Sequence, residues 1–420
     1  MAVETASSRK TRSSKGRWWQ SLMAVVIAGA VGCGGLVYAA NNSVQGAKKE
    51  VEGGFDGDAP TAILIEASSG SVLFEKNADE LRAPSSMLKL MTAEVVFNAI
   101  KKGDVKLNDE YRISENAWRR GGAPSGSSTM FAAINSKVPV SDLLHGAIIQ
   151  SGNDACIALA EGIAGNERTF ATENMTKRAR EIGLTQSTFA NSNGLPDPGN
   201  KMTVRELAKL ARYVIQTYPD MYKLFGEREF TWNKIRQQNR NPLLLSLEGA
   251  DGLKTGYTKE GGYGMVGSAV QNGMRLIVVV NGLEDPDDRA SEAKKMLEWG
   301  FRNFEARTLF APEQPVGYAK VFGGESRSVK LASPQPIKVM VHKNGSDKLI
   351  ARVVYSGPVR APVAAGQQVG LVKVWRGTNI AMEAPVYAAE PVAAGSTMRR
   401  AIDGASELVI GMFRAGAEKL

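Results

Sequence analysis

The sequence predicts an α+β domain whose first and last parts share one sheet, followed by a small all-β domain and a C-terminal amphipathic helix. Three observations support this order. Strand-like runs lie at both ends of residues 59–305 and helical runs lie between them, a pattern typical of α+β domains. Residues 306–392 hold only short strand-like runs punctuated by Pro and Gly. Residues 393–420 repeat apolar side chains at helical spacing.

Residues 1–40 have the pattern of a secretory signal peptide: a basic start, an apolar stretch and small residues at the end. We predict cleavage after Ala39 or Ala40, export of the mature protein, and a polar, Gly-rich linker over residues 41–58. Two alternatives stay open. The apolar stretch remains as a short membrane anchor, or Cys33 marks a poor lipoprotein site.

The composition is that of a globular protein with mild basicity. The chain has 420 residues, is 43% hydrophobic and 23% charged, and carries a net charge of +9. This hydrophobic content is ample for a core. Mild basicity suits an anionic membrane surface or an anionic polymer. Basic and aromatic residues do not interleave as they do in nucleic-acid-binding proteins, so no nucleic-acid partner is expected.

Cysteine and histidine are both scarce. The chain contains two cysteines, Cys33 and Cys156, and two histidines, His145 and His342. Once the signal peptide is removed, a single cysteine remains and cannot form an internal disulfide. Cys156 lies in an apolar helical run and reads as a packed small residue. We expect no metal and no cofactor, and a lysine-based nucleophile if the protein is a hydrolase.

The first elements are a predicted hairpin and a predicted helix. Thr61–Glu66 and Ser71–Glu75 read as strands joined by the turn residues 68–70. The apolar run from Ser86 to about Lys101 reads as a helix. Residues 111–131, which are rich in Gly and Ser, read as a long loop. A loop of this length is either a functional rim or disordered.

Three further helical regions follow this loop, over residues 139–162, Arg168–Ile182 and Thr203–Tyr218. The first of them encloses a polar island, Gln150–Asp154. A turn-rich stretch, residues 191–196, precedes the last of them.

The pattern changes from helices to strands near Gly252. Gly264–Val270 and Arg275–Val280 read as antiparallel strands, and the Asn272-Gly273 pair between them is a strong hairpin signal. A predicted helix, Asp287–Phe304, closes the domain.

The all-β region contains six predicted strands. They are Val316–Phe322, Ser328–Leu331, Ile337–His342, Leu349–Tyr355, Leu371–Trp375 and Ile380–Ala384.

The C-terminal helix is predicted from Thr397 to Leu420. Its apolar stripe consists of Met398, Ile402, Ala405, Val409 and Met412. Such a stripe fits a helix lying in a membrane interface, or a helix packing on its own protein or a partner. Its terminal position in an exported protein favours the membrane surface.

Ser86 and Lys89 form the first pattern with chemical meaning. A serine followed three residues later by a lysine places both side chains on one face of a helical turn. A neutral lysine can take the proton of a serine hydroxyl and so make it a nucleophile. The chain holds three Ser-x-x-Lys spacings, so the spacing alone is weak. Ser86 stands out because a turn precedes it and a buried-looking helix follows it.

Ser151-Gly152-Asn153 is the second pattern, within the polar island between two helices. A serine there can relay a proton to a leaving amine, and an asparagine can hold a substrate amide.

Lys254-Thr255-Gly256 is the third pattern, at the start of a strand. A cation and a hydroxyl together can bind a carboxylate, and a glycine lets another backbone approach closely. Alone, the second and third patterns read as an ordinary turn and an ordinary strand.

Together, the three patterns occur in the order typical of penicillin-recognising serine enzymes. The chain resembles the D-alanyl-D-alanine carboxypeptidases, the low-molecular-mass penicillin-binding proteins of the penicillin-binding-protein-5 type. Supporting stretches are residues 150–156, 251–256 and 294–301. The resemblance covers nearly everything after the signal peptide, including the all-β domain and the terminal helix. It implies a β-lactamase/transpeptidase-like fold, with an antiparallel sheet, helices on both of its sides and a helical subdomain.

The resemblance also implies a catalytic role for three residues. Ser86 would attack the peptide carbonyl between two terminal D-alanines of a peptidoglycan stem pentapeptide. Lys89 would be its general base, and Ser151 would help to pass the proton to the departing D-alanine. β-Lactam antibiotics would inhibit the enzyme because they mimic the substrate and stay attached.

The remaining implied roles concern substrate binding. Asn153 would hold the stem peptide, and the Lys254-Thr255-Gly256 motif would contact the terminal carboxylate. The backbone N–H groups of Ser86 and Tyr257 would form the oxyanion hole. Arg289 would also face the substrate carboxylate, or it is a surface charge at a helix start. Tyr257 departs from relatives that carry histidine there, which leaves substrate detail open.

We weigh three alternatives to a carboxypeptidase. A β-lactamase of class A would carry an aspartate where this chain has Gly152, and would lack the all-β domain. A D,D-endopeptidase of the same fold is harder to separate, because the cleft rim sets substrate length. A non-catalytic cell-wall or membrane scaffold is the third, and the intact motifs argue against it. The expected location is the periplasmic side of the bacterial inner membrane, as a peripheral protein.

Overall fold

The computed structural model describes residues 54–345, 348–377, 379–398, 400–401 and 403. The predicted signal peptide, most of the predicted linker and most of the predicted C-terminal helix lie outside the described residues. No helix among the described residues combines the length and the hydropathy needed to cross a membrane.

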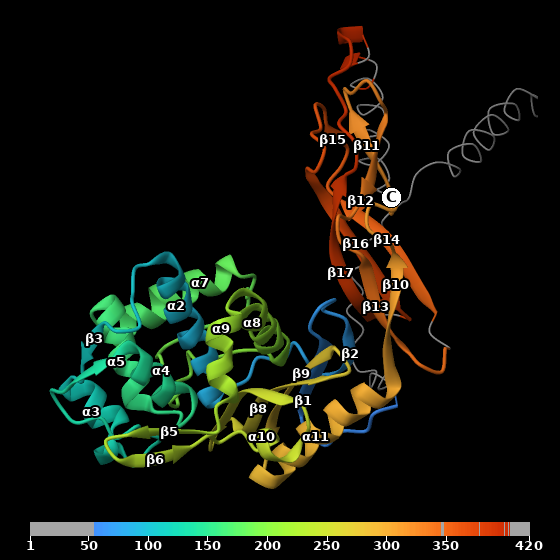
Figure 1. Ribbon diagram of the computed structural model, residues 1–420. Coiled ribbons are helices and arrows are strands. Elements are labelled where there is room, and N and C mark those ends of the chain that lie inside the picture. Colours follow the sequence, from blue (N-terminus) through green and yellow to red (C-terminus); the bar gives the residue numbers. More distant parts are fainter. Residues whose placement is uncertain (1–53, 346–347, 378, 399, 402, 404–420) are drawn as a thin grey trace, which may run out of the picture. The chain divides into compact units, whose positions relative to one another are not determined.

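A five-stranded antiparallel sheet organises the first part of the chain (Figure 1). Its strands, in sheet order, are β2 (Val72–Lys76), β1 (Thr61–Glu66), β9 (Met274–Leu283), β8 (Gly262–Gln271) and β7 (Ala250–Thr258). The first strand of the chain therefore pairs with a strand about two hundred residues later, with Ile63 opposite Val279. This confirms the prediction of one α+β domain whose ends share a sheet.

The two faces of this sheet carry alternating residues of the same strands, as a pleated strand requires. On β1, Ile63 and Ile65 join one buried cluster, while Ala62 and Leu64 join another. The first cluster includes Leu207 and Leu210 of α8 (Val204–Thr217), and the second includes Met296 of α11 (Pro286–Asn303). Helices thus cover both sides of the sheet, as the resemblance implied.

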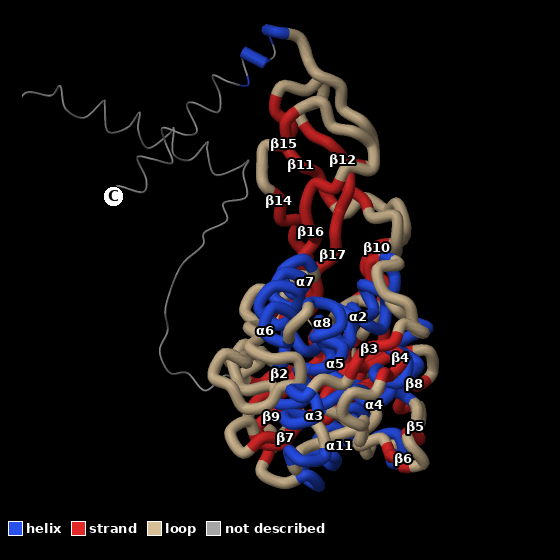
Figure 2. The backbone as a smooth tube through the Cα atoms, turned by 90° about the vertical axis from the view of Figure 1, so that its left-hand side faces the viewer, coloured by secondary structure: helices blue, strands red, loops and turns tan. Residues whose placement is uncertain are grey.

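The helical part lies between β2 and β7 in sequence. Figure 2 shows its helices gathered around α2, α5 and α8. Besides α8, its members are η1 (Ser85–Leu88), α2 (Lys89–Lys102), α3 (Glu115–Gly121), η2 (Ala123–Ser125), α4 (Val140–Ile148), α5 (Asn153–Ala164), α6 (Glu167–Thr169), the π-helical η3 (Phe170–Met175), α7 (Thr176–Glu181), α9 (Pro219–Tyr222), η4 (Lys223–Gly226) and α10 (Leu243–Ser246).

The predicted helices are confirmed here, and the predicted loop is corrected. Residues 111–131 are not a loop throughout, because α3 forms within them, between the two strands of a short antiparallel pair, β3 (Glu110–Arg112) and β4 (Lys137–Pro139). The Ser114 hydroxyl caps α3 by accepting from the N–H of Ala117 at 2.9 Å. The neighbouring Gly and Pro residues obscured this short helix in the sequence.

The hairpin of β5 (Glu229–Trp232) and β6 (Ile235–Gln238) was not predicted. The Gln237 amide donates to the carbonyl of Met130 at 3.0 Å. The hairpin is therefore held against the loop that follows α3.

The all-β region contains a six-stranded sheet in the order β14-β16-β17-β12-β11-β15 and a separate pair, β10 with β13. The strands are β10 (Phe304–Phe310), β11 (Gly317–Phe322), β12 (Ser328–Ala332), β13 (Ile337–His342), β14 (Leu349–Tyr355), β15 (Val359–Arg360), β16 (Gln368–Arg376) and β17 (Asn379–Ala388). Its core is mostly valine, including Val329, Val339 and Val374, as suits β-branched residues on strands. All six predicted strands are confirmed, whereas β10 and β15 were missed.

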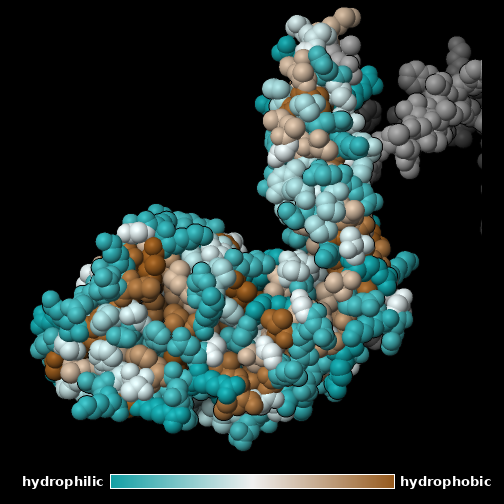
Figure 3. Space-filling view, in the orientation of Figure 1, coloured by the Kyte–Doolittle hydropathy of each residue, from teal (hydrophilic) through white to brown (hydrophobic). Residues whose placement is uncertain are grey.

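On the face shown in Figure 3, hydrophilic residues cover most of the surface, and hydrophobic residues show in hollows between the helices. Most large apolar side chains of the predicted helices and strands lie inside the protein, in the three buried clusters.

Candidate active site

Ser86 lies in the short 3-10 turn η1, and Lys89 is the first residue of α2. The buried side chains of Met87 and Leu88 anchor this turn in the core. Because the turn and the helix are continuous, the hydroxyl of Ser86 and the amine of Lys89 share one side, with 2.9 Å between Oγ and Nζ. The sequence pattern that predicted this pair is thus matched by hydrogen-bond geometry.

The Lys89 amine is buried and held at three points. Besides Ser86, its Nζ donates to Oδ1 of Asn153 at 2.7 Å and to the carbonyl of Asn193 at 2.5 Å. Burial lowers the pKa of Lys89 to about 8, the nearby Cys156 thiol opposes this shift, and the positive charge of Arg240 adds to it. Loss of water disfavours the charged amine, so the neutral form that can accept a proton is accessible near neutral pH.

Ser151 and Asn153 lie at the start of α5, in the predicted polar island. Ser151 has a φ of +64°, a left-handed conformation that typically costs about 1–3 kcal/mol outside glycine. Asn153 uses both ends of its amide: Oδ1 accepts from Lys89, and Nδ2 donates to the Ser127 hydroxyl at 2.9 Å. Asn153 therefore joins Lys89 to the serine-rich loop, which we define as residues 122–131.

Lys254 and Thr255 lie on β7, the edge strand of the sheet. Lys254 Nζ donates to Ser151 Oγ at 2.9 Å and to the carbonyl of Thr255 at 3.0 Å. Burial lowers the pKa of Lys254, and the charges of Lys89 and Arg240 lower it further. A second serine–lysine pair, Ser151 with Lys254, is thus built beside the first.

Gly256 brings β7 against the turn that carries the nucleophile. A Cβ atom at Gly256 would lie 3.1 Å from the backbone nitrogens of Ser86 and Met87. The next residue, Tyr257, lines the same pocket as Ser86. This is the close approach between two backbones that the glycine of the motif predicted.

Arg289, in α11, is not among the residues lining the pocket at Ser86. Its guanidinium lies over the Tyr263 ring at 5.5 Å, and the Tyr263 ring stacks on that of Tyr257 at 4.1 Å. Arg289 Nε is buried without a hydrogen-bond partner, and burial lowers the pKa of the guanidinium. The structure thus places Arg289 behind Tyr257, at one remove from the nucleophile.

Asn193 and Glu167 belong to the site and were not predicted from the sequence. The Asn193 carbonyl holds Lys89, and Glu167 Oε1 in turn accepts from the Asn193 amide at 3.0 Å and from the Ser192 hydroxyl at 2.8 Å. Gly194 follows with a φ of +79°, and a Cβ there would lie 2.0 Å from the Ser85 carbonyl. The turn-rich composition of residues 191–196 was the available signal.

Asp154 anchors the serine-rich loop from beneath. Its carboxylate accepts from the Thr129 hydroxyl at 2.6 Å and from the N–H groups of Met130 and Ala132 at 2.9 and 3.2 Å. Burial raises the pKa of Asp154, while these hydrogen bonds oppose the shift. The loop is therefore fixed to the first turn of α5, next to Asn153.

A cavity of about 370 Å³ opens directly above Ser86. Its walls are Gly126, Ser127, Ser128, Asn153, Gly194, Leu195, Arg240, Tyr257 and Thr258. Arg240 was not predicted as a site residue. Cys156, by contrast, is buried, and burial raises the pKa of its thiol to about 11, as expected of a packed residue.

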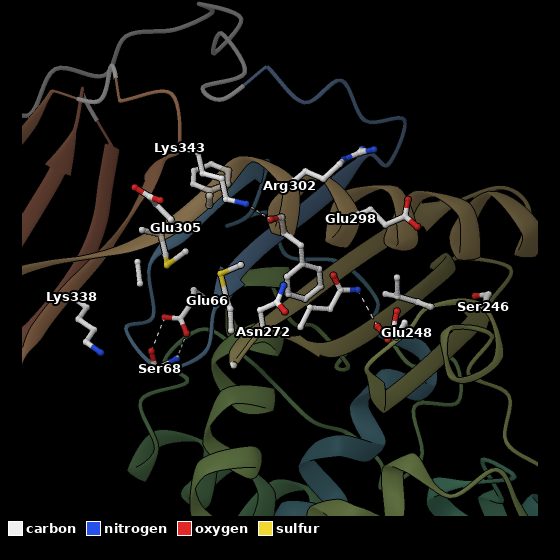
Figure 4. A pocket seen from close by; sticks show the side chains of 18 residues that line it. Glu66, Ser68, Ser246, Glu248, Asn272, Glu298, Arg302, Glu305, Lys338 and Lys343 are labelled. Carbon is white, nitrogen blue, oxygen red and sulfur yellow. Dashed lines mark hydrogen bonds between the residues drawn. The ribbon is translucent and has the colours of Figure 1, made fainter.

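A larger cavity, of about 910 Å³, lies beside α11 and β10 (Figure 4). Two of its charged groups are bound within the protein: Glu66 accepts from the N–H of Ser68 at 2.8 Å, and Lys343 donates to the carbonyl of Phe301 at 3.0 Å. It holds no serine–lysine pair. Within the described ranges, no group of three or more His, Cys, Asp or Glu side chains is arranged to hold a metal ion.

The pocket at Ser86 thus contains the groups that acyl transfer needs: a nucleophile, an adjacent base of lowered pKa, a second serine that can carry a proton, and backbone N–H groups at a helix start.

Residues 46–284 match the family described as D-alanyl-D-alanine carboxypeptidase, and residues 304–394 match the C-terminal domain of penicillin-binding protein 5.

Individual relatives are similar over most of their length. The D-alanyl-D-alanine carboxypeptidase DacC of Escherichia coli is 40% identical over 349 residues, which is 82% of this chain and 87% of that protein. The DacA carboxypeptidase of Haemophilus influenzae is 38% identical over 75% of this chain and 80% of its own. The crystal structure of penicillin binding protein 5 from Haemophilus influenzae superposes with a TM-score of 0.69 and 36% identity, covering 81% of this chain and 98% of that one.

Proposed function

This chain belongs to the D-alanyl-D-alanine carboxypeptidase family, and we propose that it removes the terminal D-alanine of peptidoglycan stem pentapeptides through an ester on Ser86. The observation that carries the proposal is the 2.9 Å distance between Ser86 Oγ and Lys89 Nζ. A base whose pKa is lowered to about 8 is well matched to proton transfer near neutral pH.

Acylation begins when the neutral Lys89 amine takes the hydroxyl proton of Ser86. The Oγ atom then attacks the carbonyl carbon of the bond between the two D-alanines. The resulting oxyanion accepts hydrogen bonds from the backbone N–H groups of Ser86 and Tyr257. The close approach of Gly256 to the Ser86 turn supports this pairing. Loss of one such donor typically lowers the rate on the order of a hundred- to a thousandfold.

Collapse of this intermediate breaks the carbon–nitrogen bond and releases D-alanine. The departing amine takes up the proton that Lys89 removed from Ser86, relayed through the Ser151 hydroxyl, which accepts from Lys254, and Lys89 is neutral again. Water then attacks the ester: Lys89 takes a proton from that water and returns it to Oγ of Ser86 as the ester bond breaks. The products are D-alanine and a stem peptide shortened by one residue.

Substrate binding uses the two sides of the pocket. Asn153 binds an amide of the stem peptide, and its contacts with Lys89 and Ser127 hold it in place. Lys254 and Thr255 bind the terminal carboxylate. Arg289, which lies behind Tyr257 and outside the pocket lining, contributes positive charge toward the same carboxylate, and among the described residues its buried Nε has no hydrogen-bond partner that would neutralise it. A β-lactam carries an equivalent carboxylate and acylates Ser86 in the same way.

Intact-mass spectrometry after mixing with penicillin tests the nucleophile. The chain without its signal peptide should gain one penicilloyl group, and Ser86→Ala should gain none. The same preparation should release D-alanine from a pentapeptide. A folded wild-type protein that gains no adduct at high penicillin would point instead to a non-catalytic scaffold.

The substrate in this assay also separates the related activities. A D,D-endopeptidase would cleave a cross-linked dimer in preference to a pentapeptide, and a β-lactamase would shed the penicilloyl group quickly. The comparisons favour neither activity.

We further propose that the protein is exported and acts on the periplasmic side of the inner membrane. The support is the signal-peptide pattern of residues 1–40, the apolar stripe of the C-terminal segment, and the mild basicity of the chain. In this proposal residues 59–305 are the catalytic domain, residues 306–392 the all-β domain, and residues 393–420 the membrane-binding helix.

A further inference from the structure

Arg240 is a cation in the active-site pocket that the proposed mechanism does not use. It follows β6, lines the cavity above Ser86, and donates from Nη1 to the Ser128 hydroxyl at 2.7 Å. Its neighbours hold the backbone: the Asn239 amide donates to the carbonyl of Glu227 at 2.8 Å, and Asn241 Oδ1 accepts from the N–H of Leu243 at 3.0 Å. Arg240 is therefore presented from a fixed position.

The charge of Arg240 is not balanced by the protein. Within the part of the chain that the structure describes, no carboxylate lies within ion-pair distance of its guanidinium. Partial burial lowers the pKa of Arg240 although the residue remains exposed to solvent, and its charge lowers the pKa of two nearby buried lysines, Lys89 and Lys254. Cations that disfavour one another's charge in this way favour an anion beside them. The pocket is thus electrostatically complementary to an anionic group.

The contacts of Arg240 favour one part of a substrate as the source of this anion. Its partner Ser128 also accepts from the N–H of Asn153 at 2.8 Å, through the carbonyl, and the adjacent Ser127 accepts from the Asn153 amide. Arg240 and Asn153 therefore share one wall of the pocket. Under the proposed function, Asn153 binds the stem peptide on the acyl side of the scissile bond.

We propose that Arg240 binds a carboxylate of the stem peptide that lies on the acyl side of the scissile bond. This inference rests on the proposed function. Arg240 then selects stem peptides by their charge upstream of the two D-alanines, whereas Lys254 and Thr255 bind the terminal carboxylate. A bidentate arginine–carboxylate contact also fixes the orientation of the peptide.

The test compares matched substrates. All the synthetic pentapeptides end in D-Ala-D-Ala. One carries a carboxylate on the side chain of residue 3, and another carries a carboxylate on residue 2. Each has a matched peptide with an amide in place of that carboxylate. For the wild-type protein we expect kcat/KM for D-alanine release to be about tenfold higher for one acid than for its own amide. The position whose amidation lowers kcat/KM identifies the carboxylate. In Arg240→Gln this ratio should fall to about one, mainly through KM, and Arg240→Lys should keep part of it.

Two controls separate this inference from general damage. Arg236→Gln removes an exposed cation from the same hairpin, where it pairs with Glu229, and should keep the acid-to-amide ratio. A ratio is insensitive to an overall loss of activity. Penicillin acylation of Arg240→Gln, measured in parallel, reports whether Ser86 still works and so tests the proposed function separately.

Three results would overturn the inference. The first is a wild-type enzyme that does not distinguish acid from amide at either position. The second is an acid-to-amide ratio that survives Arg240→Gln. The third is that Arg240→Gln lowers the rate of penicillin acylation as much as it lowers kcat/KM for the acidic pentapeptide. The guanidinium would then bind the terminal carboxylate, which penicillin also carries.

Discussion

At the scale of single residues, Lys89 links burial to reactivity. Its amine touches Ser86, Asn153 and Asn193, and none of the carboxylates in the described residues forms a hydrogen bond or ion pair with it. Burial without a carboxylate partner depresses the pKa of an amine. The group that must accept a proton is thereby kept from being permanently charged.

The lowered pKa of Lys89 predicts the pH dependence of acylation. Because the neutral amine is the base, and its pKa is about 8, the second-order rate of penicillin acylation should rise about tenfold per pH unit below this pKa and level off above it. Stopped-flow acylation at pH values from about 6 to about 9.5 measures this limb.

Arg240→Gln provides an internal check on that profile. Arg240 lowers the pKa of Lys89, so its removal should raise this pKa and move the rising limb to higher pH. Two results would argue against Lys89 as the base. One is a pH profile whose rising part does not shift in Arg240→Gln, and the other is an acylation rate that falls with rising pH over this range.

The sequence revealed some site residues and hid others for a physical reason. Ser86 and Lys89 are one helical turn apart, so local spacing brings them together. Asn193, Glu167 and Arg240 reach the site through tertiary contacts. Such residues carry no periodic pattern, and a single sequence shows nothing that distinguishes them from ordinary turn residues.

At the scale of secondary-structure elements, the distance between β7 and η1 sets the geometry of the oxyanion hole. A Cβ at Gly256 would press on the nitrogens of Ser86 and Met87 at 3.1 Å. Displacing either N–H group by a fraction of an ångström weakens stabilisation of the transition state.

Gly256→Ala should therefore lower the rate of penicillin acylation by about ten- to a hundredfold, with a modest fall in Tm. Gly267→Ala on β8 is the matched control, because its Cβ would crowd the side chains of Leu243 and Val278 at 2.6 and 3.0 Å, away from Ser86. It should lower stability by about 1–3 kcal/mol and preserve acylation. Equal acylation by both variants would show that β7 does not set the oxyanion hole.

The elements missed in the sequence share a cause. The helix α3 has seven residues and the strands β5 and β6 have four each, too short for a hydrophobic period to stand out. Helix α3 begins at a cap on Ser114, and the hairpin is held by the tertiary contact of Gln237 with Met130. The long helix α8 and the hairpin of β8 and β9, by contrast, were predictable from periodicity and turn residues.

At the scale of the whole molecule, the order of elements in the chain anticipated the central sheet. Strand patterns separated by helices implied that the first and last parts of the domain share a sheet, and β1 indeed pairs with β9 over six residue positions. What the sequence could not supply was the strand order within the all-β sheet, where β11 lies between β12 and β15. Short strands of similar composition offer no local signal for which neighbour each one takes.

The C-terminal segment makes a prediction for the protein as a whole. The chain from residue 41 to residue 420 should cosediment with vesicles containing anionic phospholipid, and a chain ending at residue 395 should not, because the apolar stripe is removed. Both should release D-alanine from a soluble pentapeptide at similar rates. Retained vesicle binding after truncation would assign membrane attachment to another surface.

In the first turn of α5, two residues that are adjacent in sequence have different roles. Asn153 faces Lys89, while Asp154 holds Thr129, Met130 and Ala132 of the serine-rich loop. The exposed tip of that loop can therefore change its sequence while the anchor and the base stay where they are. Variation at the exposed positions 123, 124 and 126, which make none of these contacts, is thereby separated from the chemistry, and an enzyme built this way can acquire new substrate preferences without first losing its old activity.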